Sequence, residues 1–110
     1  MAETIKVLGQ AALTAETETD VYTVPASTSA VLSTIVVCNR DSSANTFRIA
    51  VRPVGATLAN EHYVAYDVAL PANDSTTLTL GVTLGAADVV TVYGGASSAI
   101  SVSVFGTEIS

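Results

Sequence analysis

The sequence predicts an all-β domain, an antiparallel β-sandwich or jelly roll of about eight strands. Apolar and polar residues alternate in segment after segment, which is typical of strands with one buried face. Residues that favour turns recur at intervals of about 8–12 residues, the spacing found in sandwiches and jelly rolls. Helical periodicity is absent, and the best helical candidate, residues 55–61, is too short to be stable alone. We therefore expect a single domain over residues 1–110.

The strands follow from the alternation and from the turns between them. Phe47, Ile49 and Val51 alternate with polar or small residues, and the segments near residues 80 and 102 repeat this pattern. The run 30–39 is apolar on both faces, as expected of a central strand. Pro, Gly, Asn and Asp mark the turns. The predicted strands are residues 5–11, 19–24, 30–39, 45–53, 61–68, 75–84, 88–93 and 98–108.

The N-terminal residues 1–18 allow two interpretations. Ile5, Val7 and Leu8 have strand character, but residues 11–19 lack a pattern and are expected to form a loop. The first strand is then either an ordinary edge strand of the sandwich or an arm that adds a strand to a neighbouring subunit. Under the second interpretation, Ile5, Val7 and Leu8 are candidate partner-binding residues.

The composition excludes several classes of function. The chain is 49% hydrophobic and 13% charged, with four basic and ten acidic residues and a net charge of −6. This balance does not suit nucleic-acid phosphates or anionic membranes, and no apolar run approaches the roughly 20 residues of a membrane helix. An apolar, weakly charged surface on a small domain is typical of a chain covered by a partner. We therefore expect a subunit of an assembly. Self-association is expected as well, with a trimer as one arrangement, although the composition does not set the number of copies.

Residues for catalysis are few. His62 is the single histidine and Cys38 the single cysteine; no Gly-x-Ser-x-Gly nucleophile motif is present. Cys38 stands in an apolar run and is expected to be buried and inert. The acidic residues are scattered at turns, without the spacing of a calcium loop, and Gly94-Gly95 precedes a strand pattern where a phosphate loop would need a helix. The sequence thus predicts no catalytic residue, no metal site and no cofactor.

Arg48 and Arg52 stand out in this acidic chain. Four residues apart on a strand, they project from one face about 13 Å apart, and Arg40 lies in the preceding turn. One interpretation pairs them with Asp or Glu on neighbouring strands. The other makes them partner-binding residues that pair with acidic groups of another subunit.

The four tyrosines provide a further alternative. A carbohydrate-binding module needs exposed aromatic side chains as platforms for the sugar. If two or three of Tyr22, Tyr63, Tyr66 and Tyr93 gathered on one exposed patch, this function would gain weight.

Three stretches carry a resemblance to a known family: residues 21–26 (VYTVPA), 30–40 (AVLSTIVVCNR) and 46–56 (TFRIAVRPVGA). They resemble small β-sandwich virion proteins of tailed bacteriophages, including phages of marine and freshwater bacteria. The resemblance extends from about residue 7 to residue 109.

The resemblance implies a non-enzymatic virion component without cofactors. The expected function is that of a capsid decoration (cement) protein on the outer head surface, where it contacts the major capsid protein or other virion subunits. A tail-, neck- or fibre-associated module, with or without binding to host-surface carbohydrate, is the alternative. The acidic Glu3 stands before any apolar stretch, so no secretory signal is expected. Synthesis in the host cytoplasm and assembly into the particle agree with this.

Overall fold

The computed structural model describes residues 2–95 and 98–110. In this part of the chain, eight strands form two four-stranded antiparallel sheets. The strand order is β1-β8-β3-β6 in the first sheet and β2-β7-β4-β5 in the second. The strands are β1 Glu3–Leu13, β2 Glu18–Thr23, β3 Ser29–Asn39, β4 Asn45–Arg52, β5 Tyr63–Leu70, β6 Ser75–Leu84, β7 Val89–Gly94 and β8 Ile100–Ile109.

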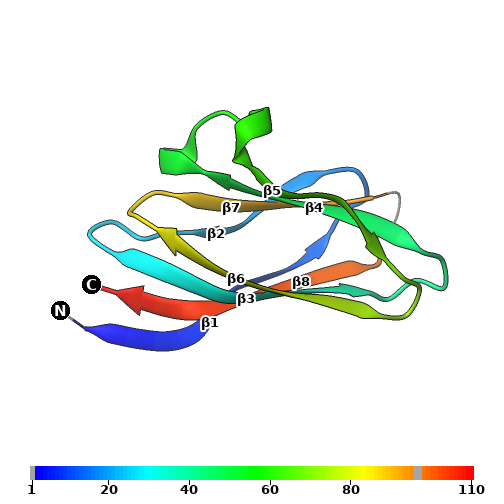
Figure 1. Cartoon of the computed structure of the whole chain (residues 1–110), viewed down its shortest axis with the longest axis horizontal. Helices are drawn as coiled ribbons and strands as arrows, with labels where there is room; N and C mark the ends of the chain where they lie inside the picture. The colour runs from blue at the N-terminus through cyan, green and yellow to red at the C-terminus, as the bar shows by residue number, and fades with distance from the viewer. Residues whose placement is uncertain (1, 96–97) are drawn as a thin grey trace.

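The strand order is that of an eight-stranded jelly roll. Successive strands belong to opposite sheets, except that β4 and β5 are neighbours in the second sheet. Figure 1 shows the sheets as two layers, with both termini at one end of the first sheet. The predicted fold class is confirmed, and each predicted strand end lies within two residues of the observed one.

The core lies between the two layers. Phe47 is the largest fully buried side chain, and it packs with aliphatic residues from both sheets. Inward and outward residues alternate along the strands, and the inward ones give each sheet an apolar face toward its partner sheet. The buried cluster consists of Leu13, Tyr22, Val24, Ala30, Leu32, Ile35, Val37, Phe47, Ile49, Leu70, Leu84, Val90, Val92, Ile100, Val102 and Val104.

The first strand is longer than the sequence predicted. β1 continues to Leu13, which is buried in the core, so the expected loop over 11–19 shrinks to residues 14–17. β1 pairs with β8 along its length, and backbone hydrogen bonds between Ala2 and Ser110 extend this pairing. The N-terminal segment is thus an edge strand of its own sandwich. Ala11 and Leu13 follow the inward pattern, but small residues around them obscure it in the sequence.

The connection between β4 and β5 contains two short 3-10 helices, η1 (Pro53–Gly55) and η2 (Asn60–His62). This segment rises above the second sheet at the top of Figure 1. Residues 55–61, the best helical candidate in the sequence, form no continuous helix, and the two short 3-10 turns lie at either end of this segment. Within the described residues, no helix is long and apolar enough to span a membrane.

Gly106 shows how tightly the central strands approach. A Cβ atom at this position of β8 would overlap the carbonyl oxygen of Val31 on the neighbouring strand. Backbone cannot yield as the end of a flexible side chain can, so a larger residue forces the strands apart.

We therefore predict that Gly106→Ala lowers the free energy of unfolding by roughly 1–3 kcal/mol, the usual cost of overpacking, measured by urea denaturation. Gly85→Ala is the matched control, because the nearest atom to its new Cβ is 3.8 Å away. The control should unfold at the wild-type midpoint or slightly above it. Equal effects of the two substitutions would contradict the prediction.

Candidate functional site

The outer face of the first sheet is uncharged over most of its area. The outward positions are identified by the alternation of burial and by cross-strand pairs such as Val7 with Phe105. In the described part of the chain, Glu3 at the end of β1 is the charged residue among them, and the guanidinium of Arg40, which follows β3, borders this face where its Nε donates to Ser101 Oγ. We call the remaining positions the neutral face: Ile5, Val7, Gln10, Ala12, Val31, Thr34, Val36, Cys38, Ser75, Thr77, Thr79, Thr83, Ser101, Ser103, Phe105 and Thr107.

The predicted partner-binding residues of β1 lie in two environments. Ile5 is 87% exposed and Val7 is 48% exposed, both at the rim of the neutral face. Leu8 instead stands at a β-bulge and packs against the core. The outer side of β1 has no neighbouring strand among the described residues. Ile5 and Val7 are therefore available to a partner, whereas Leu8 contributes to the domain's own packing.

Cys38 corrects an expectation. Its thiol is free and half-buried on the neutral face, where the sequence predicted a fully buried residue. β3 is central in its sheet, but the second sheet covers just one of its faces. The outward apolar residues Val31 and Val36 are likewise half-buried. Because β3 is apolar on both faces and is covered on one, its second apolar side lies at the surface.

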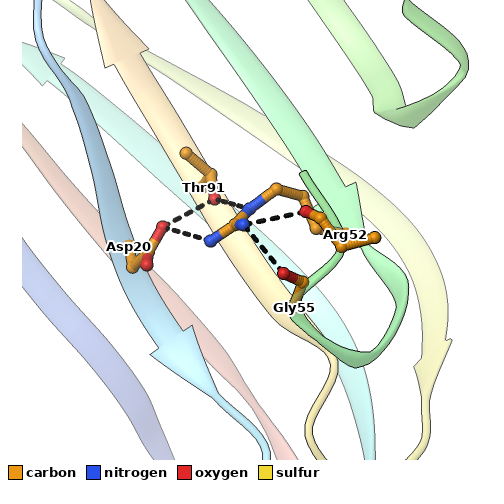
Figure 2. A network of polar contacts seen from close by, with 5 residues as sticks. Asp20, Arg52, Gly55 and Thr91 are labelled. Carbon is orange, nitrogen blue, oxygen red and sulfur yellow. Dashed lines mark hydrogen bonds and ion pairs between the residues drawn. The ribbon is translucent and has the colours of Figure 1, made fainter. Parts of the chain in front are cut away.

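Arg52 is held by its own chain (Figure 2). Its Nε donates to Thr91 Oγ1 at 3.0 Å, its Nη1 donates to the carbonyl oxygens of Gly55 and Ala56, and its Nη2 pairs with Asp20 Oδ1 at 2.9 Å. Thr91 donates in turn to the same Asp20 oxygen. The network joins β4, β7, β2 and the η1 turn. Arg52 therefore follows the intramolecular interpretation and fixes the turn on the outer face of the second sheet.

Arg48 lies at the centre of a second group on that face, which we call the tyrosine cluster: Arg48, Tyr63, Tyr66, Asp67 and Tyr93. The Arg48 Cζ atom is 4.2 Å from the ring centroid of Tyr66 and 4.6 Å from that of Tyr93, on the two neighbouring strands. Its Nε pairs with Asp67 Oδ1 at 2.6 Å. This hydrogen bond raises the pKa of Arg48 above its already high usual value.

Tyr63, the remaining member of the cluster, holds the exposed ring of Tyr66. Tyr63 meets Tyr66 edge-to-face, with centroids 4.9 Å apart and planes at 89°. Three of the four tyrosines thus gather on one surface. The fourth, Tyr22, is buried in the core.

A β-bulge in β5 creates this arrangement. Phe47 pairs with Val68 and Ile49 pairs with Ala65, so Arg48 faces two residues of β5, Tyr66 and Asp67. Bulges re-aim side chains in this way. Asp67 has φ 49°, a left-handed conformation that Asp tolerates better than most residues. The sequence gives a weak signal for the bulge, because the inward spacing from Ala65 to Val68 is three residues where a regular strand has two.

A third polar group joins the two sheets at the edge of the core. The Tyr22 hydroxyl donates to Glu108 Oε2 at 2.6 Å, and Lys6 Nζ pairs with Glu108 Oε1 at 2.8 Å. The hydrogen bonds from Lys6 and then from Tyr22 lower the pKa of Glu108. Burial, together with the bond to Glu108, raises the pKa of Tyr22 well above its usual value.

His62 takes part in a local turn. Its Nδ1 accepts a hydrogen bond from the backbone N–H of Ala59, which closes η2. Among the residues that the structure describes, no three His, Cys, Asp or Glu side chains are grouped so that they could hold a metal ion.

Comparison with known proteins gives no relative: no family model, no curated protein and no solved structure matches the chain.

Arg52→Lys should lower the free energy of unfolding by roughly 0.5–1.5 kcal/mol, the net value of a hydrogen bond, because an ammonium group cannot reach all four acceptors. Chemical denaturation measures the loss. Arg40→Lys is the control, since Arg40 is exposed and has two hydrogen-bond acceptors, Ser101 and Ser98. A loss at position 52 no larger than that at position 40 would show that the network contributes little.

Glu108 makes stability depend on acid pH. Its folded-state pKa is lowered, so its ionised form stabilises the fold above the ordinary value of 4.5, and this contribution is lost as the pH falls through the lower folded-state pKa. We predict that Glu108→Gln flattens the decline in stability between about pH 6 and about pH 3. Urea titrations across this range measure it, with Glu61→Gln as the control at an exposed position. A wild-type slope in Glu108→Gln would refute the assignment.

Proposed function

We propose that the chain is a structural subunit of a tailed-bacteriophage particle, a decoration (cement) protein that attaches to the outer surface of the head. The observation that carries the proposal is the neutral face with the open edge of β1 beside it. The resemblance of residues 21–26, 30–40 and 46–56 to small β-sandwich virion proteins supports the same function.

The neutral face suits a permanent contact because its burial removes little charge from water. Ionised groups are costly to bury unless they are paired, whereas burial of Val is favourable and the hydroxyl of Thr or Ser needs just one hydrogen-bond partner in the interface. Val31, Val36 and Phe105 supply apolar area on this face. We propose the major capsid protein as its partner.

The edge of β1 can add backbone hydrogen bonds to this contact, and these bonds fix the orientation of the partner. An unpaired edge strand presents backbone N–H and C=O groups that can bind a strand of another chain. Ile5 and Val7 flank these groups, and Lys6 is engaged with Glu108. A neighbouring subunit that adds a strand here would cover both apolar side chains and extend the first sheet.

The location is tested by cryo-electron microscopy of the particle that carries this protein. Density for the jelly roll at hundreds of positions on the head supports the proposal. A few or a few dozen copies on the tail or neck would support the tail-associated alternative. Absence from the particle would overturn both.

The contact surface is tested by substitution. We predict that Ile5→Glu weakens binding of the purified chain to heads that lack it by at least about tenfold, since a charge would be buried at the β1 edge. Co-sedimentation measures the binding. Val54→Glu is the control, because Val54 is 74% exposed but lies in η1, on the outer side of the second sheet. Equal binding by the two variants would exclude the β1 edge.

A further inference from the structure

The tyrosine cluster lies on the outer face of the second sheet, opposite the neutral face. The chain has few aromatic residues, and several of them are at the surface in this cluster. Tyr66 is 57% exposed and the Asp67 side chain 47% exposed, although the protein has six aromatic residues in all. Burial in the core therefore does not explain why these side chains are present.

The backbone is strained where the cluster forms. Asp67 adopts φ 49°, a left-handed conformation that a glycine would adopt at lower cost. Six described non-glycine residues have positive φ, and Asp67 is the one that lies within a strand, where such strain fits a required placement of side chains. Here the bulge places a carboxylate and an aromatic ring together opposite one guanidinium.

The cluster is also ordered in advance of any ligand. Arg48 is fixed by two hydrogen bonds to Asp67, at 2.6 and 3.4 Å, and by the rings of Tyr66 and Tyr93 on its two sides. Tyr63 fixes Tyr66 from a further direction. Groups that are already held on rigid strands lose little entropy on binding, which favours even a small ligand.

The chemistry of the cluster fits a sugar ring. Aromatic faces carry negative charge density and attract the weakly positive C–H groups on one face of a pyranose. The Asp67 carboxylate accepts hydrogen bonds from hydroxyls, and the Arg48 guanidinium and the tyrosine hydroxyls donate to sugar oxygens. Tyr66 and Tyr93 stand on strands two apart, about 10 Å, so one oligosaccharide can contact both.

Charge favours a neutral sugar over an acidic one. Arg48 and Asp67 balance each other, and the exposed Glu18 pairs in register with Tyr93. The surroundings of the cluster therefore carry a negative excess, which repels uronic and sialic acids.

We propose that Tyr66, Tyr93, Arg48 and Asp67 form a binding site for a neutral pyranose unit of a glycan. The site goes beyond the proposed structural function, and the isolated chain can test it without any particle.

The test is an NMR titration of the 15N-labelled chain with four neutral probes: cellohexaose, mannohexaose, galactohexaose and fully N-acetylated chitohexaose. At least one should shift the resonances of Arg48 Nε and of the amides at residues 66, 67 and 93, with a Kd of about 1 mM, the range of weak single-site binding. Polygalacturonate should bind more weakly. If none of the four neutral probes shifts these resonances, the proposal is overturned.

Two variants locate the binding. Tyr66→Ala should weaken the affinity at least about tenfold, the loss of one stacking platform, while Asp67→Asn keeps the bulge and should also weaken it. Val64→Ala is the matched control, an exposed neighbour on the same strand that should bind as the wild type does. Circular dichroism confirms that each variant is folded. Undiminished binding by Tyr66→Ala would place the sugar elsewhere and overturn the site.

Discussion

The packing of the two sheets against each other is the constraint on which the rest of the structure depends. Burial of one face of every strand forms a continuous core around Phe47 and leaves two outer faces to solvent. These faces are free to diverge, because neither contributes the main part of the buried apolar area. The first sheet carries an outer surface that is uncharged over most of its area, and the second carries the arginine networks and the tyrosine cluster.

The polar side chains of the second sheet act on its connections as well as on its surface. Arg52 ties the η1 turn to three strands, and Asp88 accepts hydrogen bonds from the backbone N–H groups of Val54 and Gly85. The charge-assisted hydrogen bond from Arg52 to the buried Thr91 contributes more than an exposed ion pair does. The intramolecular role of Arg52 therefore follows from its surroundings, and its guanidinium is largely occupied before any partner arrives.

The strands could be predicted from the sequence because alternation is a local property. Residues 75–84 show this for their bounds, which agree with the prediction, and for Leu78, which turns inward between exposed threonines, whereas Leu80, next to the positive-φ Gly81, is exposed. The strand order and the bulges depend on contacts distant in sequence, and they decide what the site contains. Tyr93 and Tyr66 meet at Arg48 because β7 and β5 flank β4, which alternation cannot reveal. Asp67 was missed for the same reason, since a bulge places it beside Arg48.

The separation of the two faces allows both proposed activities in one small domain. If the neutral face contacts a shell, the tyrosine cluster points away from that shell, because it lies on the opposite sheet. A glycan site of millimolar affinity is weak alone, but many copies on one particle raise the effective concentration and so the avidity. The fixed placement of side chains at Asp67 would then matter on a particle, where many copies bind at once, and much less for a single molecule in solution. Under these two proposals, the bulge supplies a fixed geometry, and repetition over the shell would supply the strength of attachment.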